Sequence, residues 1–308
     1  MTILIFSCNR ALQLQTLLDS LAARLLVESP LAVHVLYAAR DEAYAAGYEL
    51  VRKQYPHVQF HRERSQRSWA WPQPFSYWKN GYRFFRHADL RRTSDFKTLT
   101  ERIIADSPHE GVLFLTDDSL FIRPVRLEAA RLAIVLNDSA CTHSVSLRHG
   151  LTWQPRPVGI EPHDLGGYVW SINGGEEPGH WTWRFSVDGH LYPRRALLPI
   201  LRRLHYANPN SLEGFVNQYI QRARPDLFST LLFNEQPSLV GFILNKVQTH
   251  NGNRSFDVSP AWLNEKLLAG WRLHYRYQEP VTDFQPALDG VELIQADGHR
   301  EVLPVSRQ

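Results

Sequence analysis

The first 62 residues alternate between short apolar runs and helical patterns, and this alternation constrains the fold more than any other feature of the chain. Apolar runs at residues 1–6, 32–38 and, more weakly, 58–61 are typical of buried strands. Between them, leucines at helical spacing predict a helix from 11 to about 27. A second helix is expected over Asp41–Gln54, which its first residue can cap. This β-α-β-α-β order predicts a parallel sheet flanked by helices, so we expect an α/β fold.

The rest of the chain fits the same class but is less regular. Val112–Leu115 is the clearest strand pattern, and it runs directly into Thr116. Residues 149–180 are rich in Gly, Pro and Trp without periodicity, which is typical of binding loops or lids. The other expected elements are helices at 95–104, 126–136, 196–204 and 211–222, strands at 141–147 and 181–187, an apolar run at 239–247, and a short helix and hairpin in the tail.

The composition excludes several classes of protein. Hydrophobic residues make up 44% and charged residues 21% of the 308, which excludes a disordered or fibrous chain. A formal charge of +3 is too small to indicate nucleic-acid binding. Cys8 and Cys141 form neither a metal-spaced pair nor a disulfide framework. With no apolar stretch of about 20 residues and no signal-peptide pattern, we expect a cytoplasmic protein.

Asp117 and Asp118 are the strongest candidates for chemistry. They follow the strand pattern at 112–115, and ligands of open α/β sheets bind outside the carboxyl ends of the strands. Adjacent carboxylates repel each other unless a cation or hydrogen-bond donors compensate. A hard divalent ion would do this and would also hold a diphosphate. The alternative is a turn in which one Asp caps a helix and the other is solvated.

Residues 61–92 combine eight Lys or Arg with eight aromatic residues and only two acids. Such a segment can bind nucleic acid, lie at a membrane interface or offer tryptophan faces to sugar rings. In the simpler interpretation, Trp78, Tyr82 and Phe85 are core residues at helical spacing. We expect a packed helix from about Phe75, with Trp69 and Trp71 nearer a binding cleft; the tryptophans at 153, 170, 181 and 183 invite the same prediction.

The sequence resembles the nucleotide-sugar-dependent glycosyltransferases of the GT-A fold, in particular bacterial, family-2-like members. The resemblance spans about residues 2–270. It is carried by the opening Ile3–Arg10 strand and turn, Val112–Phe121 with its Thr116-Asp117-Asp118 sequence, Val187-Asp188-Gly189, Asn208–Gly214, Asn245–Asn253 and Leu263–Gly270.

The resemblance implies roles for these residues. The Asp-any-Asp motif of the family binds the donor's ribose and a Mn²⁺ or Mg²⁺ ion, and here Thr116 stands at its first position. Asp118 is therefore the expected metal ligand, Asp117 contacts ribose or metal, and His250 is placed where a late histidine completes the metal shell. The loop after the first strand, with Ser7, Asn9 and Arg10, is placed to bind the nucleoside, and Arg10 to pair with phosphate or stack on a base.

Transfer from a nucleotide-sugar makes two chemical demands. Negative charge develops on the leaving phosphate, which a metal ion or an arginine can stabilise. An inverting enzyme also needs a carboxylate base that takes the proton of the acceptor hydroxyl. We expect Glu213, near the start of a helix, to be that base, and Asp188, before Gly189, to bind a sugar hydroxyl. The alternatives are a Glu that favours the helix dipole and an Asp-Gly turn. Inversion and retention both stay open, and a retaining enzyme would not need Glu213 as a base.

The resemblance thus implies a three-layer α/β/α GT-A domain over residues 1–255 with a mostly parallel sheet. Its donor half would cover about 1–125, its acceptor half about 126–255, and a C-terminal extension 256–308. The donor would be a nucleotide-sugar, with a UDP-sugar favoured, and the acceptor a glycan or glycolipid. No stable nucleic-acid partner is expected, while a peripheral membrane contact and a homodimer stay open.

Three other functions compete with this interpretation. A nucleotidyltransferase would open with a Gly-rich phosphate loop, which residues 7–14 lack. A non-catalytic module could bind nucleic acid or an anionic glycan through residues 61–92. A hydrolase using Asp117 and Asp118 as an acid/base pair is disfavoured, because adjacent residues of a strand point to opposite faces.

Overall fold

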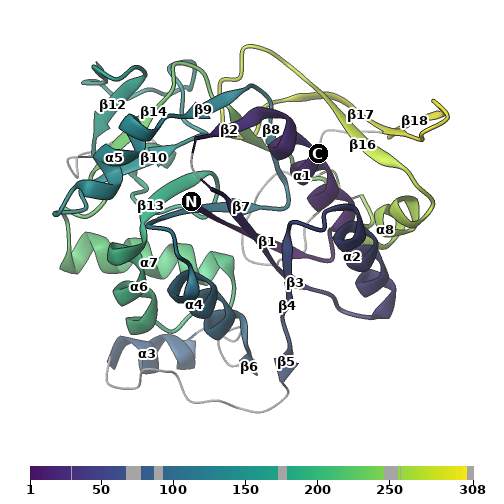
Figure 1. The fold of residues 1–308 in the computed structure, drawn as a ribbon, viewed down its shortest axis with the longest axis horizontal. Coiled ribbons are helices and arrows are strands. Elements are labelled where there is room, and N and C mark those ends of the chain that lie inside the picture. Colours follow the sequence, from purple (N-terminus) through teal and green to yellow (C-terminus); the bar gives the residue numbers. More distant parts are fainter. Residues whose placement is uncertain are drawn as a thin grey trace.

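The structure is a computed structural model that describes residues 1–28, 30–66, 78–86, 93–172, 179–245, 256 and 258–303. Its centre is a nine-stranded sheet (Figure 1). The half from β4 to β7 is entirely parallel, as the opening alternation predicts. Beyond it, β13 runs antiparallel between β7 and β10. In sheet order the strands are β11 (Glu161–Pro162), β12 (Tyr168–Ser171), β14 (Thr230–Phe233), β10 (His143–Ser146), β13 (His190–Pro193), β7 (Gly111–Thr116), β1 (Thr2–Cys8), β3 (Ala32–Ala38) and β4 (Gln59–Arg62).

Helices cover both faces of this sheet, because alternate side chains of its strands point to opposite sides. Ile3 and Ile5 join one hydrophobic cluster, whereas Leu4 and Phe6 join another. On the first face lie α1 (Ala11–Arg24), α2 (Glu42–Gln54), α5 (Ala129–Asn137) and α8 (Pro260–Leu268). On the second lie α4 (Phe96–Asp106), α6 (Arg194–Arg203) and α7 (Pro209–Ala223). The predicted three-layer α/β/α, Rossmann-like class is confirmed.

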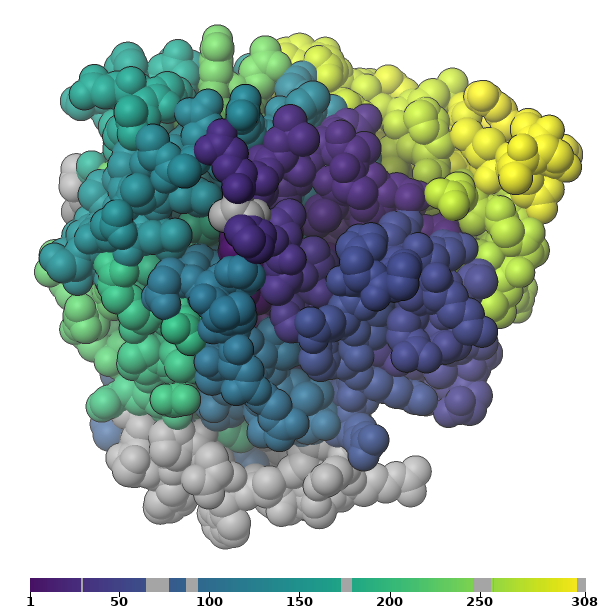
Figure 2. Space-filling model, in the orientation of Figure 1, coloured from purple at the N-terminus to yellow at the C-terminus, as the bar shows by residue number. Residues whose placement is uncertain are grey.

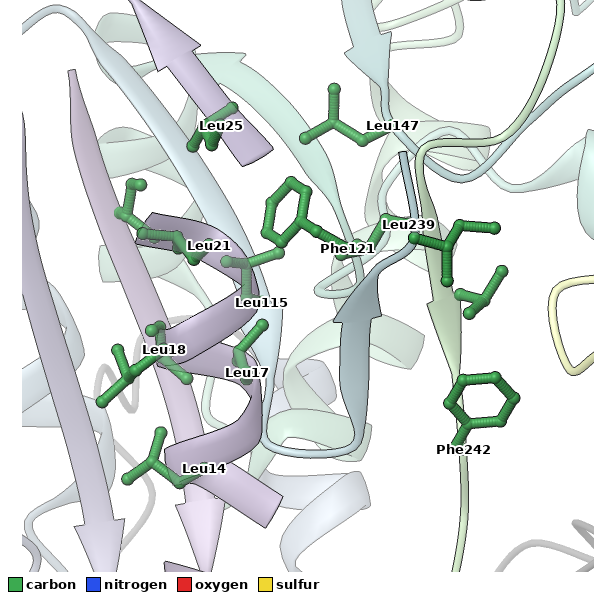
Figure 3. Close-up of a cluster of buried hydrophobic side chains, with 14 of the residues drawn as sticks. Leu14, Leu17, Leu18, Leu21, Leu25, Leu115, Phe121, Leu147, Leu239 and Phe242 are labelled. Carbon is green, nitrogen blue, oxygen red and sulfur yellow. The ribbon is translucent and has the colours of Figure 1, made fainter. Parts of the chain in front are cut away.

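The leucine repeat of α1 forms the centre of the first cluster. Leu14, Leu17 and Leu18 pack in one cluster with Leu115 of β7 and with Phe121 just beyond that strand, and Leu115 and Phe121 are both completely buried (Figure 3). This periodic stripe is why the segment is a helix packed on a sheet. Leu115 directly precedes the residues of the candidate site, so this packing fixes the end of β7.

Smaller sheets surround the central one. They pair β2 (Leu25–Val27) with β9 (Val125–Leu127), β5 (Ser65–Gln66) with β6 (Thr93–Ser94), and β8 (Ser119–Phe121) with β15 (Leu239–Gly241), while β16 (Arg272–Tyr277), β17 (Leu288–Ile294) and β18 (Arg300–Leu303) form an antiparallel sheet. None of the helices within the described ranges combines the length and apolar character needed to cross a bilayer.

The C-terminal segment packs beside the N-terminal third of the chain (Figure 2). Asn264 of α8 donates from its Nδ2 atom to the Ala43 carbonyl at 2.8 Å, and Arg272 Nη1 lies 2.7 Å from Asp19 Oδ2. Apolar residues of α8 and β16–β18 belong to the same cluster as those of α1. The division at residue 255 stays a prediction.

Several expected boundaries are wrong. The helix expected over 11–27 ends at Arg24, and the one expected at 126–136 begins at Ala129, because β2 and β9 pair between them. The strand expected at 181–187 is absent: residues 179–182 form a 3₁₀ turn. Side chains take the amide hydrogens that a neighbouring strand would otherwise bind, as where Phe185 N donates to Asn217 Oδ1 at 3.0 Å.

The expected burial of the aromatic residues of α3 (Trp78–Arg86) is also wrong. Trp78, Tyr82 and Phe85 are among the exposed large hydrophobic residues of the protein. The inner face of α3 consists instead of Asn80 and Arg83, both buried, together with Phe84. Helical spacing groups residues on one face but does not say which face meets the core.

Candidate functional site

The parallel half of the sheet has a switch point between β1 and β7. Strands β1, β3 and β4 follow one another outward on one side, whereas β7, the next strand of this sheet in sequence, lies on the other side of β1. This is the 3-2-1-4 order of a Rossmann-like sheet, in which ligands bind outside the carboxyl ends of the strands at such a point. The residues that follow β1 and β7 therefore flank the expected ligand position.

Asp117 is fixed at this point by the end of β1. Its Oδ2 atom accepts hydrogen bonds from Ser7 Oγ at 2.9 Å and from the Cys8 amide at 3.1 Å. Its own amide donates to the Phe6 carbonyl at 3.0 Å. Burial raises the pKa of Asp117 to about 6, while the positive charge of Arg10 acts in the opposite direction. Asp117 is thus a buried carboxylate in a defined orientation.

Arg10 lies between the two adjacent carboxylates. Its Nη1 atom is 3.0 Å from Asp117 Oδ1 and 3.2 Å from Asp118 Oδ2. Its Nε atom donates to Asn245 Oδ1 at 2.7 Å, and Nη2 donates to the Asn245 carbonyl. Arg10 therefore supplies the compensating cation that the Asp pair was expected to need. Binding of a phosphate or a nucleobase by Arg10 stays a prediction. A bound nucleotide-sugar would share the Arg10 guanidinium with the two carboxylates.

Ser7 and Asn9 shape the loop after β1. Ser7 Oγ lies 2.6 Å from the Tyr48 hydroxyl, which also accepts a hydrogen bond from the Arg10 amide at 3.1 Å. Asn9 has a φ of 56°, a left-handed conformation that Asn tolerates, and its Oδ1 accepts from the Arg40 amide at 2.8 Å. The sequence analysis did not identify Tyr48 as a site residue, because an aromatic residue at helical spacing on α2 is typical of a core position.

Asp118 is linked to Asp188 through Thr116. The Thr116 hydroxyl lies 2.7 Å from Asp118 Oδ1 and 2.6 Å from Asp188 Oδ1. Because this hydroxyl has one hydrogen, it donates to one carboxylate at a time. Thr116 thus brings together two carboxylates that are 70 residues apart in sequence. Their spacing in the sequence did not predict this contact.

Asp188 reaches this position through Gly189, which has a φ of 72° and whose amide donates to the Phe114 carbonyl at 2.8 Å. A Cβ atom at Gly189 would lie 2.4 Å from a Leu239 methyl group, so both conformation and space require glycine. Arg148, which sequence reasoning missed, lies with its Nη1 atom 2.7 Å from Asp188 Oδ2. No sequence pattern distinguishes Arg148 from the other arginines.

Glu213 lies on α7, which begins at Pro209 behind an Asn208 capping box. The helix starts two residues earlier than expected, so Glu213 is in its second turn. Glu213 Oε1 accepts from the Val187 amide at 3.2 Å. Burial, and after it the charge of Asp188, raises the pKa of Glu213 to about 7. A carboxyl group with this pKa can exchange a proton near neutral pH.

A small pocket opens beside the ion pair of Arg148 and Asp188, and Arg148 is one of its lining residues. Ser186, which hydrogen-bonds to Glu213, is one of its lining residues. Its walls are largely aromatic: the lining residues are Arg148, His149, Trp153, His180, Trp183, Ser186, His190 and Phe284. Trp153 packs with the buried Trp170 and Trp181, so these two support the pocket from behind.

Several polar atoms of the residues that line the pocket lack a hydrogen-bond partner. His190 Nδ1 donates to the Asp188 carbonyl at 2.9 Å, which leaves its Nε2 atom as an acceptor, and burial lowers the pKa of His190 to about 4. Within the described part of the chain, four atoms of these lining residues are buried and have no hydrogen-bond partner: Arg148 Nε, His149 Nε2, Trp153 Nε1 and His190 Nε2. Hydrogen-bonding atoms beside aromatic rings are suited to a polyhydroxylated ring.

A metal role for Asp118 and His250 stays a prediction. Across the described ranges, no group of three or more His, Cys, Asp or Glu side chains is arranged to hold a metal ion. Both oxygens of Asp118 already have partners in Arg10 and Thr116. His250, Trp69 and Trp71 lie outside the described residues.

No protein-family model matches the sequence, and no curated protein is significantly similar to it. Two solved structures of S. aureus TarS resemble it distantly in fold. The chain aligns with "TarS 1-349" over 78% of its own length and 59% of that chain, at 12% identity and a TM-score of 0.39. It aligns with TarS over 87% and 42%, at 11% identity and a TM-score of 0.40. The chain thus spans less than two thirds of either structure, and these scores assign no chemistry to it.

Proposed function

We propose that this protein is a glycosyltransferase that moves a sugar from a nucleotide-sugar, with a UDP-sugar favoured, to a carbohydrate or glycolipid acceptor. The observation that carries the proposal is a continuous set of polar contacts from the sheet's switch point to the aromatic pocket. It passes from Asp117 and Arg10 through Asp118, Thr116 and Asp188 to the rim of the pocket. The set offers two adjoining positions, one for the donor and one for the acceptor.

The donor's nucleoside is assigned to the loop after β1, where Asp117 meets the ribose. A divalent ion on Asp118 and His250 would, when bound, neutralise charge on the leaving diphosphate. Arg10 contributes positive charge at the same place, and its contacts with both carboxylates hold it in position before the donor arrives.

The acceptor is assigned to the pocket, with Glu213 as the base. As the acceptor oxygen bonds to the anomeric carbon, its proton passes to Glu213 and the bond from that carbon to the phosphate oxygen breaks, so the nucleoside diphosphate leaves with the electron pair. A carboxyl group with a pKa of about 7 is suited to this step near neutral pH. Asp188 would hold a hydroxyl of the sugar, oriented by Arg148.

Calorimetric titration with UDP, GDP, CDP and ADP, each with and without Mn²⁺, tests the donor position. We expect one diphosphate to bind, and Asp118→Asn to weaken its binding by at least about tenfold if the ion bridges them. Asp164→Asn, at an exposed loop position, is the matched control and should bind normally. Binding that is indifferent to Mn²⁺ and to Asp118 would remove the metal site but retain the nucleotide.

Turnover separates an enzyme from a binding module. With the identified nucleotide-sugar, Glu213→Gln should retain nucleotide binding but lose about 10²–10⁴-fold in transfer, or in donor hydrolysis when no acceptor is present. If none of the four nucleotides binds to a folded protein, the glycosyltransferase proposal is wrong. A salt-dependent screen of anionic glycans and nucleic acids would then test the binding module.

A further inference from the structure

Helix α3 carries an exposed aromatic face that the proposed function does not use. Trp78, Tyr82 and Phe85 are 72%, 56% and 64% exposed. At 3.6 residues per turn, these three positions lie within about 60° of one another around the helix. Figure 1 places α3 at the outer edge of the molecule, beside α6. Large aromatic residues gathered on one exposed face are typical of an interaction site.

The orientation of this helix is fixed by its inner face. Asn80 is completely buried; its Nδ2 atom donates to the Arg203 carbonyl at 3.0 Å, and its Oδ1 atom accepts from the His205 amide at 3.1 Å. The guanidinium of Arg83 lies 4.1 Å from the centre of the Phe215 ring. Because these contacts join α3 to α6 and α7, the aromatic face is held outward by the fold.

Two cations of α3 contact the aromatic face, and α3 and α6 contain no Asp or Glu. Lys79 Nζ lies 5.7 Å from the centre of the Trp78 ring, and Arg86 Nη1 donates to the Tyr82 hydroxyl at 2.6 Å. Arg202, at the adjoining end of α6, is exposed. The partner of this face should therefore combine negative charge with an apolar layer.

We propose that the α3 face binds the surface of an anionic lipid bilayer. The aromatic rings would enter the interfacial layer, where Trp and Tyr are enriched, and Lys79, Arg86 and Arg202 would contact lipid phosphates. Single-stranded nucleic acid also offers phosphates and stacking, but proteins bind it in grooves that follow its backbone. Aromatic rings on one convex helical face are better suited to a flat bilayer surface than to a single strand of nucleic acid.

Co-sedimentation of the full chain with vesicles tests this proposal. Vesicles of phosphatidylcholine mixed with phosphatidylglycerol should bind the protein, whereas pure phosphatidylcholine should bind it weakly. The double variant Trp78→Ser/Tyr82→Ser should lower the partition coefficient at least about tenfold. Lys79→Gln and Arg86→Gln should each lower the partition coefficient about fivefold. Added salt should also lower the partition coefficient of the native protein, because it screens the attraction between these cations and the lipid phosphates.

Leu268→Ser and Val302→Ser are the matched controls, since these residues are 48% and 60% exposed on α8 and β18, far from α3 in Figure 1. Unchanged unfolding midpoints will show that all variants fold. The proposal is overturned if native protein ignores anionic vesicles, if the aromatic variant binds like the controls, or if the face binds a single-stranded oligonucleotide but no vesicle. None of these outcomes depends on nucleotide-sugar turnover.

Discussion

Removing Arg10 should destabilise the fold strongly, because this residue neutralises a buried carboxylate. Arg10 and Asp117 have side chains 7% and 5% exposed and lie 3.0 Å apart. Replacing Arg10 with Met keeps most of the side-chain volume but leaves Asp117 without its counter-charge. Breaking a buried pair in this way costs about 3–5 kcal/mol, a large share of the roughly 5–15 kcal/mol by which a typical domain is stable.

A double-mutant cycle isolates the pair. Asp117→Asn removes the charge that Arg10 compensates, so Arg10→Met should cost less in that background, with a coupling free energy of about 2–3 kcal/mol. Urea unfolding followed by circular dichroism, in the presence of EDTA, measures all four proteins. Arg126→Met is the control, because its ion pair with Glu28 has side chains 62% and 45% exposed; its midpoint should hardly move.

The effect should depend on pH. In the folded protein burial raises the pKa of Asp117 from 3.8 to about 6. As pH rises, the unfolded chain therefore loses this proton at lower pH than the folded protein does, and the free energy of unfolding falls between about pH 3.8 and pH 6. Without Arg10 the folded pKa rises further, and the loss extends to higher pH. The gap between native protein and Arg10→Met should therefore be wider at about pH 8 than at about pH 5. A gap below about 1 kcal/mol at the higher pH, or a coupling near zero, would refute the reasoning.

Three further predictions concern single positions. The transfer rate should rise with pH through about 7, because Glu213 must lose its proton to act as a base, and Glu213→Gln should abolish that dependence; a flat profile in the native enzyme would assign the base elsewhere. Gly189→Ala should lower the thermal midpoint and weaken binding of the acceptor, since its Cβ would collide with Leu239 at a φ of 72°; a normal midpoint would contradict this. Asn208→Ala should cost about 1 kcal/mol by removing the cap that binds the Ser211 amide at 2.8 Å, whereas Asn208→Asp should restore it in urea unfolding.

Local patterns in the sequence were sufficient for most of the parallel half of the sheet. The leucine repeat of α1 and the uninterrupted apolar run of β7 each fold as their own periodicity indicates. Asp41 caps α2 as expected, accepting a hydrogen bond from the Tyr44 amide at 3.1 Å. The position of Asp117 and Asp118 follows from the same reasoning, because the end of a buried strand in such a sheet is a binding edge.

Partners distant in sequence decided the rest. Arg10 meets Asn245, and Asp188 meets Arg148 and Thr116, only because segments far apart in the chain become neighbours in the fold. No local periodicity encodes which arginine reaches which carboxylate. The expected strand at 181–187 does not form, because side chains of other elements accept hydrogen bonds from the amides of residues 184–187.

Helix α3 shows the division most simply. Its sequence fixes that Trp78, Tyr82 and Phe85 share one face, since the spacing of a helix is a local property. Which face turns inward depends on the partners that α6 and α7 offer to Asn80 and Arg83, more than 120 residues later in the chain. The sequence alone therefore determined the main elements of the parallel half of the sheet and the position of Asp117 and Asp118 at the end of β7. The tertiary structure decided the partners of each charged group and the faces left exposed, because burial and pairing depend on contacts that no short window of sequence contains.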